Sequence, residues 1–324
     1  MRRWIRGGLG LALVCLLSAF GCGSSSGKST VAVPTFDGNR SYEDLVTQVN
    51  FGPRAPNSAA HTACLSWLKQ TLGAQCSDVT DQSFTYAGKD GVTYTGDNII
   101  AYFAGTAPAG SAKLFIGAHW DCRPVADQDP NPANHSTPIP GADDGASGVA
   151  ALTEMARAFK AVPPPIPVEL VAVDLEDMGN TPATTGEPYE GFCLGTRYFA
   201  ANQGRFAPGQ AIILDMIGYS KLSIPQEQYS MASDPALMSS IFGDAAALGY
   251  TQFVAQPGEY IIDDQKPLID AGIPSIDLID LNYPYWHTLA DTADKCSGTS
   301  LKAVGQTLLQ MIYTSTSSRG RGGK

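Results

Sequence analysis

The chain has 324 residues, of which 44% are hydrophobic and 16% are charged. This length is enough for one large α/β domain or two small ones, and the composition allows a packed core and excludes wholesale disorder. The formal net charge at pH 7 is −10. Nucleic-acid binding depends on clustered Lys and Arg that contact the phosphates, so an acidic protein of this kind is not expected to bind nucleic acid.

The N-terminal segment has the pattern of an export signal. Three arginines precede an apolar run from Leu9 to Phe20, which is too short to cross a bilayer. The residues before Cys22 resemble the lipobox of bacterial lipoproteins. We therefore expect residues 1–21 to be a lipoprotein signal peptide. The exported protein would face the periplasm of a Gram-negative bacterium and associate with the membrane only through a lipid on Cys22. Plain secretion is the alternative.

The rest of the chain is expected to form a single domain. Residues 22–36 begin with a Gly/Ser stretch and predict a flexible tether. Residues 37–316 form the domain, and residues 317–324 are a Ser-, Gly- and Arg-rich tail that we expect to be disordered. No repeat or linker divides the domain, and we expect a monomer.

Two of the seven cysteines, Cys15 and Cys22, belong to the N-terminal segment. The other five are Cys64, Cys76, Cys122, Cys193 and Cys296. Because five is odd, at least one thiol stays free or pairs with a partner outside this protein. The pair that we favour for a disulfide is Cys64 with Cys76, which are close in sequence, and exported proteins can hold such bonds. No cysteine spacing indicates a thiolate metal site.

Strand-like apolar runs alternate with helical patterns along the domain. In sequence order they are strand 113–119, helix 146–160, strand 168–174, helix 194–202, strand 211–217, helix 234–248, strand 273–279 and helix 300–313. This alternation predicts an α/β fold with a mostly parallel, mixed central sheet flanked by helices. In such sheets ligands bind at the carboxyl ends of the strands.

Acidic and histidine side chains follow these strands, or begin a helix, in five segments. The segments are 117–121, 141–148, 174–177, 214–218 and 285–288. One Asp at a strand end is more often a helix N-cap than a ligand, but capping does not explain five such clusters at one sheet edge. Carboxylates crowded there would repel one another without a cation between them. Imidazole and carboxylate ligands with an open position are typical of catalytic zinc.

Through these segments the protein resembles the zinc-dependent aminopeptidase-like family, with its phosphorylase/hydrolase-like fold, which also contains the animal-type glutaminyl cyclases. The resemblance covers residues 98–313. The zinc ligands that it implies are Asp144, Asp177 and His287. Glu176, one residue before a ligand, matches the general acid/base. Asp143 is expected to cap or hydrogen-bond its loop, and Asp177 is shorter than the Glu often found at its position.

The resemblance leaves the number of zinc ions open. The peptidases of this family bind two zinc ions, and the second takes ligands at positions matching His119 and Asp215, with Asp144 bridging. The cyclases keep these residues but resemble one-zinc enzymes, in which Asp215 enters a hydrogen-bond network with the general base. We expect one Zn²⁺ in a cyclase and two in an aminopeptidase.

A tryptophan favours the cyclase. Trp286 immediately precedes His287, as in the cyclases, and an indole there can wall a small pocket for the side chain of an N-terminal Gln. Ordinary core packing of the indole is the alternative. Animal cyclases carry a second pocket tryptophan shortly after the acidic pair, but residues 178–190 contain none, so another residue must shape that wall.

The segment 262–267 also resembles a cyclase segment. There the first acid, Asp263, joins Glu176 and Asp215 through hydrogen bonds, and Gln265 is a candidate for substrate binding. A surface turn is the alternative.

Together these residues make the protein resemble the animal-type bacterial glutaminyl-peptide cyclotransferases. Such an aminoacyltransferase converts the N-terminal Gln of peptides or proteins to pyroglutamate and releases ammonia. The alternative is a di-zinc aminopeptidase that hydrolyses N-terminal residues from peptides. A non-catalytic metal site or partner-binding module is a third hypothesis, and Glu176 argues against it, because a structural site has no use for an unligated acid beside the metal.

Overall fold

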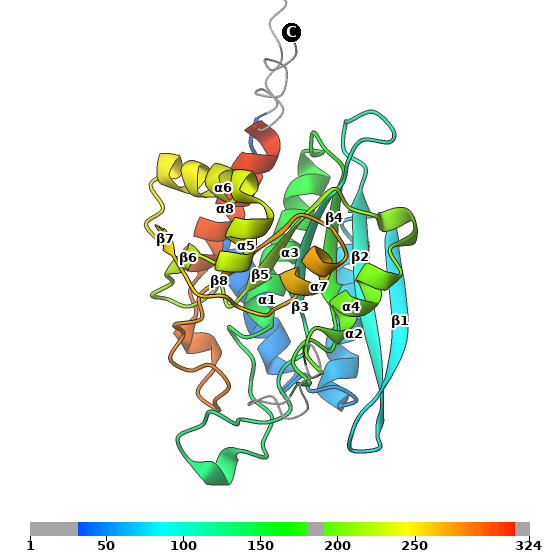
Figure 1. The fold of residues 1–324 in the computed structure, drawn as a ribbon, viewed down its shortest axis with the longest axis vertical. Coiled ribbons are helices and arrows are strands. Elements are labelled where there is room, and N and C mark those ends of the chain that lie inside the picture. The colour runs from blue at the N-terminus through cyan, green and yellow to red at the C-terminus, as the bar shows by residue number, and fades with distance from the viewer. Residues whose placement is uncertain (1–31, 180–188, 190, 315–324) are drawn as a thin grey trace, which may run out of the picture. The chain divides into compact units, whose positions relative to one another are not determined.

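The computed structural model describes residues 32–179, 189 and 191–314 (Figure 1). The predicted signal peptide, Cys22, most of the tether and the tail after residue 314 lie outside the described residues. Within the described part of the protein, no helix is long and apolar enough to cross a membrane.

A six-stranded sheet in the order β1-β2-β4-β3-β5-β8 lies at the centre of the domain (Figure 1). Four neighbouring strands are parallel: β4 (Val168–Val173), β3 (Leu114–His119), β5 (Gln210–Asp215) and β8 (Ser275–Ile279). An antiparallel hairpin of β1 (Val79–Ala87) and β2 (Thr93–Phe103) extends the sheet beside β4. The predicted mixed, mostly parallel α/β sheet is therefore confirmed. A separate two-stranded sheet pairs β6 (Ile224–Gln226) with β7 (Phe253–Pro257).

Helices cover both faces of the sheet. The larger core holds side chains of α1 (Gly38–Asn50), α2 (Ala59–Gly73), α3 (Ala146–Ala161), α6 (Pro235–Leu248) and α8 (Gly298–Thr314). The smaller core, on the opposite face, holds side chains of α4 (Leu194–Ala201) and α7 (Gln265–Asp270). The short helix α5 (Gln228–Ser233) precedes α6, and three 3₁₀ turns span Pro132–Asn134, Gly204–Phe206 and Ala293–Lys295.

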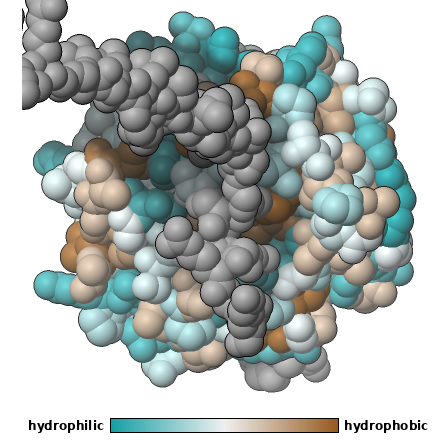
Figure 2. Space-filling model, turned by 90° about the horizontal axis from the view of Figure 1, so that it is seen from above, coloured by the Kyte–Doolittle hydropathy of each residue, from teal (hydrophilic) through white to brown (hydrophobic). Residues whose placement is uncertain are grey.

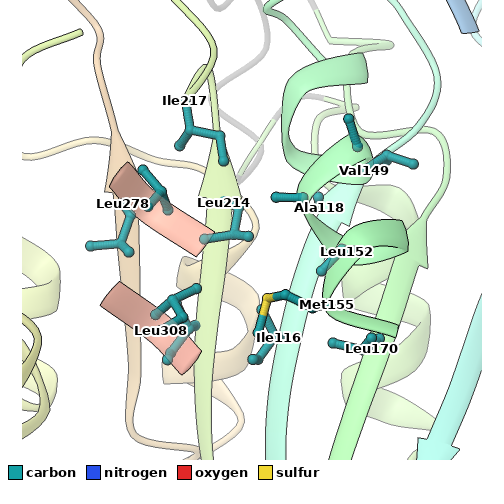
Figure 3. Close-up of a cluster of buried hydrophobic side chains, with 14 of the residues drawn as sticks. Ile116, Ala118, Val149, Leu152, Met155, Leu170, Leu214, Ile217, Leu278 and Leu308 are labelled. Atoms are coloured by element: carbon teal, nitrogen blue, oxygen red, sulfur yellow. The ribbon is translucent and has the colours of Figure 1, made fainter. Parts of the chain in front are cut away.

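Successive residues of β3 point to opposite cores. Ile116 and Ala118 face α3, together with Leu214 of β5 (Figure 3), whereas Phe115 packs on Phe199 of α4 in the other core. Both faces of the strand are thus buried, which explains why the central strands are continuous apolar runs and not alternating patterns.

The eight predicted elements all appear, with ends shifted by at most a few residues. No element is predicted from the sequence at α1, α2, α5, α7, β1, β2, β6 or β7. The hairpin lacks the continuous apolar signature, because β1 is an edge strand whose side chains are mostly partly or fully exposed. Helix α1 begins with a recognisable cap, since the Asp37 side chain accepts hydrogen bonds from the backbone N–H groups of Asn39 and Arg40.

Two expectations, one about the start of the domain and one about a disulfide, differ from the structure. The tether was expected to reach residue 36, but Phe36 is only 1% exposed and packs against Gly305 of α8. Gln306 also accepts a hydrogen bond from its backbone N–H. The domain therefore begins before residue 36.

The favoured Cys64–Cys76 disulfide is absent, and both residues are buried free thiols. The Cys76 thiol instead donates to the backbone oxygens of Asp78 and Tyr102.

The surface mixes side chains of both kinds. Hydrophilic and hydrophobic residues are interspersed on the face seen in Figure 2. Among the described residues, the exposed large hydrophobic ones are Val92, Leu248, Tyr260 and Ile262. Scattered exposure of this kind is normal for a folded domain.

A glycine at the start of α3 sets how closely this helix approaches the sheet. A Cβ at Gly148 would lie 2.3 Å from the Leu214 carbonyl oxygen and 2.7 Å from the Ala118 Cβ. We predict that Gly148→Ala lowers the free energy of unfolding by about 1–3 kcal/mol through overpacking. The matched control is Gly243→Ala in α6, where nothing lies within 4 Å, and it should stabilise the protein by up to about 1 kcal/mol. Urea unfolding of both variants measures the difference. Equal effects would contradict the close contact.

Candidate metal centre and active site

Three buried side chains from separate loops meet at the carboxyl edge of the sheet. Asp144 precedes α3, Asp177 follows β4, and His287 lies after β8. Their ligand atoms all lie within 4.8 Å of one another. The His287 Nε2 atom is 3.7 Å from Asp144 Oδ2 and 3.6 Å from Asp177 Oδ1. The fold thus brings the three predicted zinc ligands into one group.

The donor atoms fit a divalent cation. The Oδ2 atoms of Asp144 and Asp177 are buried and have no hydrogen-bond partner, although a buried charged oxygen without a partner is costly. A cation coordinated by these oxygens and by His287 would satisfy them. Two carboxylates and one imidazole are ligands that zinc accepts.

The segment of Asp144 is held by other acids. The Asp291 carboxylate accepts hydrogen bonds from the backbone N–H groups of Asp143 and Asp144, at 2.9 and 3.3 Å, and from the Tyr283 hydroxyl at 2.7 Å. The Asp143 side chain accepts a hydrogen bond of 2.6 Å from the N–H of Gly218, so it joins its loop to the segment after β5. These bonds present the Asp144 side chain to the metal group.

Asp121 performs the same task for the acidic pair after β4. Its carboxylate accepts hydrogen bonds from the backbone N–H groups of Glu176 and Asp177, at 3.1 and 3.3 Å. Asp177 also forms a β-bridge with Phe192. With the backbone fixed in this way, the Asp177 side chain joins Asp144 and His287, and the adjacent Glu176 side chain joins a different group of residues.

Arg123 and Asp127 lie directly behind the predicted ligands. Arg123 donates a hydrogen bond of 2.7 Å to Asp177 Oδ1 and another of 2.7 Å to Asp127 Oδ1. The same Asp127 oxygen lies 3.2 Å from His287 Nδ1. A carboxylate on the far nitrogen of a ligand histidine fixes the tautomer and ring orientation. Neither residue has a role predicted from the sequence, because no pattern in the sequence indicates that the segment 122–140 lies against His287.

A second group adjoins the first and shares Asp144. His119 Nε2 lies 3.3 Å from Asp144 Oδ1 and 3.2 Å from Asp215 Oδ1, and these ligand atoms also lie within 4.8 Å of one another. The arrangement serves equally as a hydrogen-bonded cluster and as a second metal site. Geometry alone therefore leaves the choice between one and two zinc ions open.

The charges at this edge call for a counter-ion. Although burial opposes protonation, hydrogen bonds to Asp121, Asp144 and Asp215 hold the pKa of His119 well above its ordinary value. Burial raises the pKa of Asp177 to about 6, against the opposing charge of His287. Acids that take up protons, and imidazoles that keep them, are the expected response to excess negative charge.

Glu176 belongs to a third group. Its ligand atom lies within 4.8 Å of those of Cys193 and Asp263, and all three residues are buried. Burial, followed by the charge of Asp177, raises the pKa of Glu176 well above its ordinary value. Burial and the charge of Asp215 do the same for the pKa of Asp263. A carboxyl group whose pKa is raised in this way can hold or release a proton during a reaction.

The expected hydrogen-bond network of the acids differs in part from the structure. Within the described residues, the Asp215 side chain bonds to His119 and makes no hydrogen bond to Asp263 or Glu176. Asp263 lies beside Glu176 as expected, but its buried Oδ2 has no partner. His119, at the end of the adjacent strand β3, lies 3.2 Å from Asp215 and engages its carboxylate.

The two predicted substrate-binding residues have different surroundings. Trp286 is partly buried and stacks on the His287 ring, with 3.8 Å between the ring centroids, so its indole borders the metal group.

Gln265, the other predicted substrate-binding residue, is fully buried. Its Oε1 accepts hydrogen bonds from the backbone N–H groups of Asp263 and Lys266, and its Nε2 donates to the Ile261 oxygen. Gln265 is therefore bonded to the Asp263 loop, and its role in substrate binding stays a prediction. Most of the segment 178–190, which lacks the second pocket tryptophan of the animal cyclases, lies outside the described residues.

Strained backbone is concentrated at this edge. Leu175, Cys193, Met216 and His287 are non-glycine residues with φ between 46° and 55°. Each adjoins or belongs to a group described above. Such conformations persist where surrounding contacts impose them, and they recur at active sites.

The contact of Asp127 with His287 generates a prediction. Asp127→Asn keeps the shape of the side chain but removes the charge that Arg123 and His287 share, so zinc affinity should fall about 10- to 100-fold. Competition with a chromophoric chelator measures the dissociation constant. Asp78→Asn is the matched control, since Asp78 pairs with Arg205 on the surface, and it should bind zinc like the wild type. If both variants bind zinc with the same affinity, Asp127 does not support the metal site.

Several known proteins are similar to this one in fold and in sequence. The family model described as peptidase family M28 matches residues 98–312. A structure of a leucine aminopeptidase precursor from Bacteroides thetaiotaomicron is 37% identical, covers 88% of this protein and 99% of its own length, and has a TM-score of 0.83. A glutaminyl cyclase from the same organism, bound to N-acetylhistamine, is 36% identical over 87% and 99% of the two proteins, with a TM-score of 0.81. A Tannerella forsythia glutaminyl cyclase is 34% identical over 87% and 99%, with a TM-score of 0.82. The protein belongs to peptidase family M28.

Proposed function

We propose that this protein is a glutaminyl cyclase that converts the N-terminal Gln of peptides or proteins to pyroglutamate and releases ammonia. The observation that carries this proposal is the stacking of Trp286 on His287, which puts an indole wall beside the metal group. The similarity to two solved glutaminyl cyclases supports it. A flat indole suits a small amide side chain.

The proposed metal is one zinc ion held by Asp144, Asp177 and His287. When bound, zinc polarises the amide carbonyl of the Gln side chain. The residues of the protein supply the remaining chemistry. Trp286 orients the Gln side chain, and the buried position of Glu176 keeps its carboxylate close to the reacting groups and away from bulk water.

Glu176 is the proposed general acid/base. Its carboxylate accepts a proton from the α-amine as the amine nitrogen bonds to the amide carbon of the Gln side chain. It then returns that proton to the amide nitrogen, which leaves as ammonia. Atoms and charges balance without a water molecule. The nearby Asp263 discourages a second negative charge and so favours proton sharing in this group.

A di-zinc aminopeptidase is the second candidate. His119 and Asp215 beside Asp144 offer a second set of ligand atoms, and one similar structure is named a leucine aminopeptidase precursor. In that reaction Glu176 would activate a water molecule against the first peptide bond.

We further infer that the enzyme acts as a monomer after export, on the periplasmic side of a Gram-negative membrane and anchored through a lipid on Cys22. The basic and apolar N-terminal pattern supports this localisation. The proposed partners are peptides or proteins with N-terminal Gln, and the net charge of −10 argues against nucleic acid.

The two candidate activities give different products from one substrate. With Gln-β-naphthylamide, the purified protein should release ammonia without free naphthylamine, because cyclisation breaks the amide bond of the Gln side chain and leaves the naphthylamide bond intact. The same sample should contain about one zinc per protein molecule by metal analysis. Free naphthylamine together with about two zincs would identify the peptidase instead.

The role of Glu176 is tested by an isosteric change. Glu176→Gln should lower turnover at least about 10²-fold, because the amide cannot accept the proton, while the zinc content stays at the wild-type level. Glu169→Gln is the matched control, since Glu169 is a buried acid near the opposite end of β4, and it should keep wild-type turnover. If Glu176→Gln retains full activity, the assignment is wrong.

A further inference from the structure

Cys193 is joined to Glu176 through its backbone. It immediately precedes α4, and its N–H donates a hydrogen bond of 2.8 Å to the backbone oxygen of Glu176. The next two N–H groups, of Leu194 and Gly195, bond to the oxygens of Leu175 and Asp174. The start of α4 is therefore held in a fixed register against the strand end that carries the general base.

The Cys193 side chain also contacts the carboxyl group of Glu176. Its Sγ lies 3.4 Å from Glu176 Oε1, within the range of a thiol hydrogen bond. The side chain is fully buried. Burial, and then the negative charge of Glu176, raises the pKa of the Cys193 thiol well above its ordinary value. The thiol is therefore neutral at physiological pH and acts as a donor to the carboxylate.

The backbone at this residue would favour glycine. Cys193 has φ 55° and ψ 33°, a left-handed conformation that costs free energy for any residue with a Cβ. A cysteine in place of glycine at this position is explained if its side chain makes an interaction that offsets the cost of the backbone conformation. Within the described residues, no other side chain donates a hydrogen bond to the Glu176 carboxyl group.

A second buried acid makes such a donor necessary. Asp263 completes the same group, and its Oδ2 has no hydrogen-bond partner. Two acids whose oxygens lie within 4.8 Å of each other repel when both are ionised, unless a donor engages one of them. A neutral thiol beside them engages one oxygen of Glu176 without bringing a charge that would quench its basicity.

We propose that Cys193 is a positioning residue for the general base: its S–H donates to Glu176 Oε1 and fixes the carboxylate so that the other oxygen meets the substrate amine. The inference rests on the proposed function only in the role of Glu176, which is the acid/base in both the cyclase and the aminopeptidase. It requires no redox chemistry and no metal on the sulfur.

The test compares side chains with and without a donor. Cys193→Ala removes the hydrogen bond and should lower kcat about 10-fold with KM changed less than about twofold, because the substrate still binds but meets a poorly oriented base. Cys193→Ser restores a donor of similar size and should recover kcat to within about threefold of the wild type. The matched control is Cys64→Ala, a buried thiol in α2 outside the site, and it should leave both constants unchanged.

Zinc content and thermal unfolding are measured on every variant, so that a loss of fold or metal is recognised. If Cys193→Ala does not fold, Cys193→Gly replaces it, since glycine removes the backbone strain as well as the thiol. The inference is overturned if the folded, zinc-loaded Ala or Gly variant keeps the wild-type kcat, or if Ser fails to restore kcat. The product released by the wild type, ammonia or naphthylamine, decides the proposed function separately, and kcat is then measured for that reaction.

Discussion

The concentration of buried negative charge at the carboxyl edge of the sheet is the constraint on which the site depends. Asp144, Asp177 and Asp215 converge on His119 and His287 within a few ångströms. Buried carboxylates repel and lose hydration, so this arrangement is stable only with compensating positive charge and hydrogen bonds. The unpartnered oxygens of Asp144 and Asp177 mark where the compensation is incomplete, and they are the oxygens that a cation would bind.

An outer layer of buried hydrogen bonds keeps these side chains in place. Asp121 and Asp291 use both carboxylate oxygens to hold the backbones of the acidic pair and of the Asp144 loop. Arg123 joins Asp177 to Asp127. Because Asp121, Arg123 and Asp291 are buried, their hydrogen bonds are strong and the geometry behind the metal group is well defined. The loops that carry the ligands are irregular but well anchored.

A structure named as a leucine aminopeptidase precursor and one named as a glutaminyl cyclase resemble this protein to nearly the same degree. Trp286 stacks on His287 and so lies beside the metal group. Asp215 and Asp144 both lie against His119, an arrangement that serves either a hydrogen-bonded cluster or a second ion. Function within the family therefore depends on side chains around a common site and not on the sheet itself.

The sequence by itself determined the central strands, the helices that follow them and the segments that carry the ligands. Continuous apolar runs and flanking glycines are local signals of a parallel sheet, and its strand ends must share one edge. Only the tertiary structure decided that Asp215 turns to His119, that Gln265 bonds its own loop, that Asp127 backs His287 and that Cys193 reaches Glu176. Those pairings join segments distant in sequence or depend on one rotamer among several. The path of the intervening loops and the packing around each side chain select them, and neither leaves a periodic pattern in the sequence.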